Sequence, residues 1–107
     1  MSYDVGDVVR VGNYSGASLS EPFENIVGAA TDPTAVSLTV ERPDATVLVY
    51  GWPLAGDDGT LTKESTGRFY FDVGLDQPGM WRYRLVGTGT AAAAARGQFI
   101  VRSKWAG

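Results

Sequence analysis

The sequence predicts an all-β protein folded as a single antiparallel β-sandwich of about seven strands. Most segments alternate apolar and polar residues with a period of two, which is typical of strands with one face in solvent. Glycine, proline and aspartate interrupt these segments at roughly the 8–12-residue spacing expected of a sandwich or barrel. The length of 107 residues suits one domain with one core, which we expect to span residues 1–107.

The predicted strands follow from the alternation in each segment. In 80–87, Trp81, Tyr83 and Leu85 share the apolar face, while Arg82 and Arg84 lie on the polar face. The other strands show the same pattern less regularly. They are expected at 7–12, 35–41, 46–52, near Leu61, at 68–76 and at 97–103.

Three segments fall outside this pattern. Residues 13–34 form a long connection, and an extra edge strand around 25–27 is an open alternative within it. The alanine-rich stretch 90–97 is too short for an independent helix, so we interpret it as the approach to the last strand. Residues 103–107 form a short C-terminal tail.

The stretch "LDQPGMWRY" at 75–83 resembles the corner between the fifth and sixth strands of immunoglobulin-type sandwiches. In that corner an aromatic residue follows an Asp- and Gly-containing turn and fixes it. Trp81 occupies the position of the corner aromatic, and Tyr83 shares its inward phase. We therefore expect both rings in the core of an immunoglobulin-like domain rather than on a ligand platform.

The composition argues against an enzyme. The chain has neither cysteine nor histidine, which removes the commonest nucleophile–base pairs and the commonest metal ligands. The adjacent Asp57 and Asp58 do not match a calcium-binding loop and are typical of a solvated turn. We expect no catalytic residues, no metal and no cofactor.

Charge is distributed unevenly along the chain. Residues 1–60 carry nine acidic and two basic side chains, whereas residues 61–107 carry three acidic and seven basic ones. Two interpretations stay open: chance differences between strands, or an acidic and a basic side suited to docking. The net charge of −3 and the lack of a basic cluster argue against nucleic acid, and no segment suits a membrane or a signal peptide.

Four phrases resemble a known family: "YDVGDVVRV" at 3–11, "DPTAVSLTVERPD" at 32–44, "STGRFYFDVGLDQPGMWRYRLVGTG" at 65–89 and "GQFIVR" at 97–102. They are similar to the small immunoglobulin-like virion structural proteins of tailed bacteriophages, especially those that infect actinobacteria. The segment 13–31 and the loop with Trp52 and Pro53 depart from that pattern.

The resemblance implies a non-enzymatic virion protein, made in the bacterial host cytoplasm, that decorates the capsid by docking on the major capsid protein. A head–tail connector or tail-associated protein is the alternative within phage structure, and self-association is also open. A carbohydrate-binding or adhesion module that recognises a host-surface glycan is the alternative from another class.

The candidate interface residues are aromatic or basic side chains expected outside the core. Aromatic and arginine side chains are enriched at protein interfaces. The candidates are Tyr14, Phe23, Tyr50, Trp52, Arg82, Arg84 and Trp105.

Overall fold

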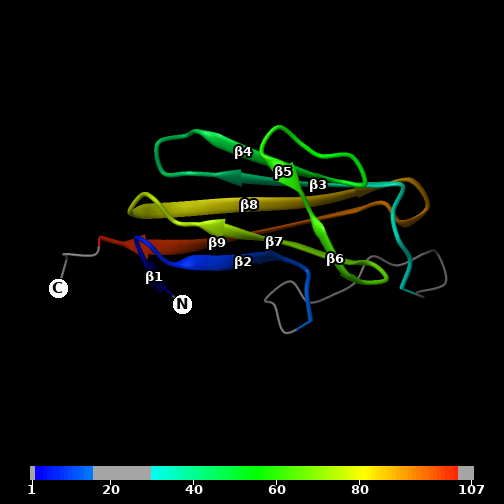
Figure 1. The fold of residues 1–107 in the computed structure, drawn as a ribbon, viewed down its shortest axis with the longest axis horizontal. Coiled ribbons are helices and arrows are strands. Elements are labelled where there is room, and N and C mark those ends of the chain that lie inside the picture. The colour runs from blue at the N-terminus through cyan, green and yellow to red at the C-terminus, as the bar shows by residue number, and fades with distance from the viewer. Residues whose placement is uncertain (1, 16–29, 104–107) are drawn as a thin grey trace.

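The computed structural model describes residues 2–15 and 30–103, and these residues are all-β (Figure 1). They form nine strands, a single-turn 3₁₀ helix at Gly89–Ala91 and no α-helix. The strands are β1 (Ser2–Asp4), β2 (Val8–Gly12), β3 (Ala35–Glu41), β4 (Val47–Trp52), β5 (Gly59–Thr60), β6 (Thr62–Ser65), β7 (Arg68–Gly74), β8 (Gly79–Thr88) and β9 (Ala93–Arg102).

Two sheets contain these strands. Sheet A has the order β1-β9-β8-β3-β4-β5, and sheet B has the order β2-β7-β6. The pairs β1–β9 and β4–β5 are parallel, while the other pairs are antiparallel. Figure 1 shows β5 and β6 running across the molecule, where the chain leaves sheet A and enters sheet B.

The buried side chains of both sheets form one hydrophobic cluster, as expected of a β-sandwich. Sheet A contributes Leu38, Trp81 and Leu85, and sheet B contributes Phe69 and Val73, all of which are almost fully buried. On β3 and β8 these residues occupy alternate positions, so the predicted two-residue period is confirmed there.

The strand count differs from the predicted seven for local reasons. β1 was not predicted, because three residues are too few to show a period and their partner β9 lies at the other end of the chain. The region near Leu61 contains two strands, β5 and β6, in different sheets. Leu61 is buried between them, and its N–H donates to the Gly51 carbonyl at 2.8 Å.

The last strand begins at Ala93, inside the alanine-rich stretch that we expected only to approach it. Alanine has little preference for strands, but Ala93, Ala94 and Ala95 continue the uninterrupted pairing of β9 with β8. The possible strand at 25–27, Phe23 and Trp105 lie outside the described residues.

Candidate interaction surface

Trp81 is part of the core, as predicted. Its side chain is fully buried, with its ring stacked on Phe99 at 6.1 Å between centroids. The indole Nε1–H donates to the Gln77 carbonyl at 3.0 Å, four residues upstream in the turn between β7 and β8. This bond satisfies the polar atom of a buried tryptophan and ties the turn to the strand that follows.

Tyr83 lies on the same inward phase and is partly buried. It pairs across strands with Gly97, and a Cβ added to Gly97 would lie 2.4 Å from the tyrosine Oη and 2.5 Å from Cζ. The ring therefore covers a glycine that has no side chain of its own to pack. Burial raises the pKa of the Tyr83 phenol above its ordinary value.

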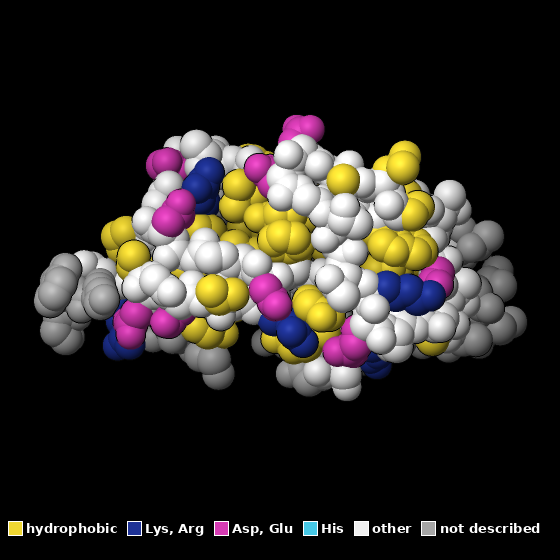
Figure 2. All heavy atoms as spheres, in the orientation of Figure 1, with side chains coloured by type: hydrophobic (Ala, Val, Ile, Leu, Met, Phe, Trp, Pro, Cys, Tyr) yellow, Lys and Arg dark blue, Asp and Glu magenta, His cyan; other side chains and the backbone are white. Residues whose placement is uncertain are grey.

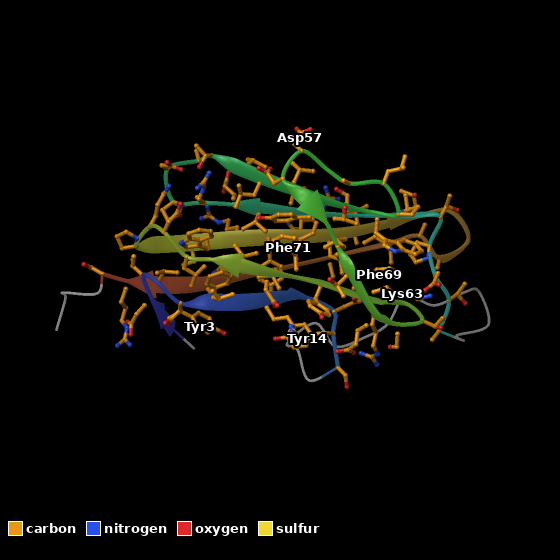
Figure 3. The ribbon with its side chains drawn as sticks, in the orientation of Figure 1. Tyr3, Tyr14, Asp57, Lys63, Phe69 and Phe71 are labelled. Atoms are coloured by element: carbon orange, nitrogen blue, oxygen red, sulfur yellow. The ribbon has the colours of Figure 1, made fainter. Side chains whose placement is uncertain are left out.

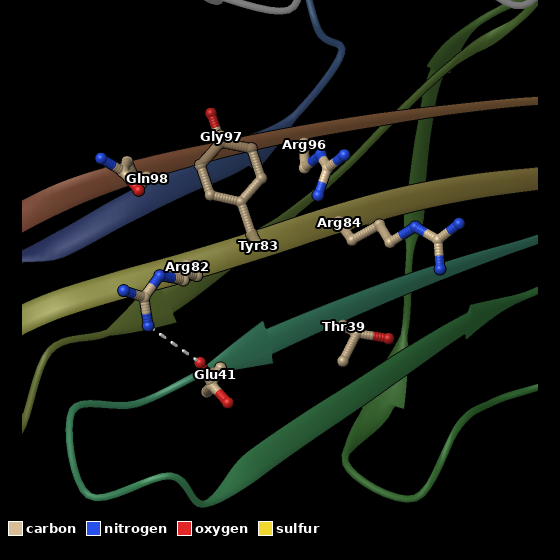
Figure 4. Close-up of a pocket in the computed structure, with 8 residues that line it drawn as sticks. All are labelled: Thr39, Glu41, Arg82, Tyr83, Arg84, Arg96, Gly97 and Gln98. Atoms are coloured by element: carbon tan, nitrogen blue, oxygen red, sulfur yellow. Dashed lines mark hydrogen bonds and ion pairs between the residues drawn. The ribbon is translucent and has the colours of Figure 1, made fainter.

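The opposite, outer face of sheet A carries basic side chains. We call the residues Thr39, Glu41, Arg82, Arg84, Arg96 and Gln98 the arginine face (Figure 4). They come from β3, β8 and β9 and, with Tyr83 and Gly97, line a shallow depression of about 520 Å³. Three arginines and a single glutamate thus line one depression on a protein whose net charge is −3.

Only part of this positive charge is neutralised. Arg82 Nη1 lies 3.4 Å from Glu41 Oε1, and both side chains are well exposed. Arg84 and Arg96 stand directly opposite each other on β8 and β9, and neither forms an ion pair with any described residue. Like charges at directly opposed positions destabilise a sheet. A carboxylate from another molecule would relieve this repulsion.

Tyr50 is an interface candidate because its ring is expected outside the core, and the structure contradicts that expectation. The side chain is only 4% exposed and stacks on Phe71 with ring centroids 3.9 Å apart. The segment 46–52 is apolar on both phases, so alternation could not identify its inner face. Pairing with β3 places Tyr50 opposite Leu38, which is completely buried.

Trp52 follows two residues later on the same face but is only partly buried. Its ring packs on Phe69 with centroids 4.7 Å apart, and Lys63 Nζ lies 5.9 Å from the ring centroid. It therefore belongs mainly to the margin of the core.

Tyr14 belongs to a separate cluster on sheet B. Its ring meets Tyr70 edge-on at 6.3 Å, and the Arg10 guanidinium lies 3.9 Å from the Tyr70 ring centroid. Arg10 Nε also contacts Asp72 Oδ1 at 2.9 Å. These groups satisfy one another, in contrast to Arg84 and Arg96. Figure 3 shows Tyr14 on the side of β2 away from Phe71.

The paired aspartates form a loop, and Asp57 stands at its outer tip (Figure 3). Asp58 Oδ2 accepts a hydrogen bond from the Val49 N–H at 2.7 Å, which fixes the loop against β4. Within residues 2–15 and 30–103, no group of three or more acidic side chains gathers as a metal site would require. The same residues include no helix long and apolar enough to span a membrane.

One broad side of the molecule presents apolar atoms at its centre, bordered by charged side chains (Figure 2). Sheet B has three strands and sheet A has six, so part of the inner face of sheet A is left uncovered. Leu48 and Trp52 of sheet A are accordingly only partly buried, and so is Phe71 of sheet B, which stacks on Tyr50.

Arg82 and Arg84 are among the interface candidates expected from the sequence, and the structure adds Arg96, which lies beside Arg84. The alternation of the last predicted strand places Gln98 and Ile100 on one face, and continuing that strand towards the alanines places Arg96 on the same face. The β8–β9 register then brings this phase onto the arginine face.

Comparison with known proteins identified no relative: no family model, no curated protein and no solved structure matches the chain.

Proposed function

We propose that the sandwich is immunoglobulin-like. The order β9-β8-β3-β4-β5 against β2-β7-β6 corresponds to the two sheets of a variable-type domain, in which extra strands extend the sheet that holds the sixth and seventh strands. The Trp81–Gln77 hydrogen bond supports the same assignment, because a corner aromatic in these domains bonds to the backbone a few residues upstream.

On this scaffold we infer a non-enzymatic virion structural protein whose arginine face docks on an acidic surface of another virion protein. Decoration of the major capsid shell is the preferred role, as the sequence resemblance implies. The observation that carries the docking proposal is the exposed Arg84–Arg96 pair, which has no carboxylate partner among the described residues. A role at the neck or tail is the second candidate within the particle.

The carbohydrate-binding alternative loses support from the position of Tyr50. Stacked sugar sites use two or more exposed rings, and Tyr50 with Trp52 was the pair available for such a site. The Tyr50 ring is covered by Phe71, and the Trp52 ring packs on Phe69. A glycan-binding screen of the isolated domain is expected to be negative.

The proposed function is tested by measuring the chain in purified particles of the virus that encodes it. We expect its gene beside those for a major capsid protein, a portal or a terminase, and many copies of the chain in each particle. Absence of the chain from particles would overturn the proposal. A low copy number would instead assign it to the neck or tail.

A further inference from the structure

We propose that the edge of β9 left unpaired among the described residues binds an extended acidic segment of another polypeptide, which adds a strand to sheet A next to Arg96. This inference rests on the proposed docking function and specifies the contact and the chemistry of the partner.

The edge is long and unpaired in the described part of the chain. One side of β9 pairs with β8 from Ala93 to Val101. The other side pairs with β1 only from Ile100 to Arg102, so residues 93–99 have no strand beside them among the described residues. At about 3.3 Å per residue, this edge extends for roughly 20 Å.

The hydrogen bonds identify which residues face the open side. The Arg102 carbonyl accepts from the Val5 N–H at 3.0 Å, so Arg102 points toward β1. The N–H and C=O of one residue point to the same side of a strand, and successive residues alternate. Ala94, Arg96 and Gln98 therefore direct their backbone groups to the open edge, whereas Ala95 and its odd-numbered neighbours bond to β8.

This edge lacks most of the usual protection against strand addition. Natural edges are blunted by charged side chains, especially lysine, and by proline, bulges or short length. Residues 93–99 contain no proline or lysine, Arg96 is their single charged residue, and their pairing with β8 shows no register shift. Alanine and glycine occupy four of these positions, so few side chains obstruct an approaching backbone.

Charge determines the class of partner. Because the backbone N–H and C=O of Arg96 face the open edge, Arg96 forms no backbone hydrogen bond with Arg84, its partner on β8. In such a non-hydrogen-bonded pair the two side chains come closest. A second depression, of about 450 Å³, lies over Arg84, Ala94, Ala95 and Arg96. An incoming strand with an aspartate or glutamate on its outer face would place a carboxylate beside both guanidinium groups. A second β9 edge would bring another Arg96 instead.

The experiment titrates the full chain with a short peptide that alternates threonine and glutamate, and follows backbone amide signals by NMR. We expect the largest shifts at Ala94, Arg96 and Gln98. The same peptide with lysine in place of glutamate is expected to bind at least about tenfold more weakly. Absence of binding by the acidic peptide, or equal binding by the lysine peptide, would overturn the inference.

Two variants separate strand addition from simple charge attraction. Ala94→Pro removes an N–H on the open side of β9 but no hydrogen bond to β8, and it should weaken binding of the acidic peptide at least about tenfold. Ala94→Val keeps that N–H and should change the affinity less than about twofold. Arg96→Gln should weaken binding of the acidic peptide to a similar degree as Ala94→Pro. Loss of binding in Arg96→Gln with none in Ala94→Pro would contradict strand addition.

A measurement on the unmodified chain covers the case in which Ala94→Pro does not fold. The acidic peptide N-methylated at alternate residues cannot complete the ladder and should not bind when the methylated edge faces β9. Unchanged binding of both peptides, one methylated on each edge, would contradict the inference.

Dimerisation of the chain alone with shifts at the same amides would instead assign the edge to a second copy. Failure of the peptide tests while the chain remains in virus particles would refute strand addition but leave the docking function intact.

Discussion

At the scale of single residues, the inward position of Trp81 determines which side chains of β8 lie on the outer face of sheet A. With its indole inside and bonded to Gln77, neither Trp81 nor its neighbour Tyr83 offers an exposed aromatic platform. The alternating residues Arg82 and Arg84 are consequently presented to solvent. The chemistry of the free face thus follows from the packing of the opposite one.

We predict that Trp81→Phe lowers the free energy of unfolding by about 1–3 kcal/mol, because it removes buried volume and leaves the Gln77 carbonyl without its donor. The measurement is urea denaturation followed by circular dichroism. Trp52→Phe is the matched control, and its effect should be smaller since Trp52 is only partly buried. Equal effects of the two variants would argue against Trp81 as the residue that holds the corner.

Gly97 is the second residue with a specific structural requirement. Gly97→Ala should destabilise the fold by about 1–3 kcal/mol, because the new methyl group would collide with the Tyr83 ring. In a Tyr83→Ala background the same change should cost much less, which a double-mutant cycle measures as a coupling energy. Additive effects would show that the ring does not cover Gly97.

At the scale of elements, sequence patterns identified strands whose two faces differ. β3, β7 and β8 each bury one phase, and the alternation made them predictable. β4 is apolar on both phases, so the inner position of Tyr50 depends on its register with Leu38. The start of β9 consists of alanine, and only its pairing with β8 makes it a strand and brings Arg96 to the arginine face.

Asn13 connects β2 to the hairpin of β6 and β7. The buried side chain donates to the Gly67 carbonyl at 2.9 Å and accepts from the Phe69 N–H at 2.8 Å. Asn13→Ala should therefore cost about 1–3 kcal/mol for each group left unsatisfied, measured by urea denaturation. Gln98→Ala, which truncates an exposed amide, should change stability by less than about 0.5 kcal/mol. A similarly small effect at Asn13 would contradict this role.

Asp32 joins the approach to β3 to the same hairpin. Burial acts to raise the pKa of its carboxyl, but hydrogen bonds from Lys63 Nζ at 2.5 Å and from the Gly67 N–H at 2.8 Å outweigh this and lower the pKa below its ordinary value. Because the folded pKa lies below the unfolded one, the stabilisation is present above about pH 4 and is lost as the pH falls through the folded value.

We accordingly expect the urea midpoint of the wild type to fall more steeply below about pH 4 than that of Asp32→Asn. Asparagine retains an acceptor for the Gly67 N–H but does not titrate. Parallel pH profiles of the two proteins would show that Asp32 contributes no pH-dependent stability.

At the scale of the whole molecule, the fold brings together much of the charge that is separated along the sequence, because the ion pairs join residues of the first half to residues of the second. Arg42, Lys63 and Arg102 each contact an aspartate, while Arg84 and Arg96 contact none in the described residues. A protein with net charge −3 thus presents on its outer sheet a basic pair that no acidic side chain of the described residues neutralises. This supports docking over a chance difference between strands.

The most direct test of docking is the number of copies of the chain in purified particles carrying wild-type protein or the variant Arg84→Glu/Arg96→Glu. Both positions are exposed, so the variant should keep its circular dichroism spectrum and its urea midpoint within about 1 kcal/mol of the wild type. We predict that the wild type stays on the particle and that the folded variant is lost from it. Equal retention of the two proteins would contradict docking through the arginine face.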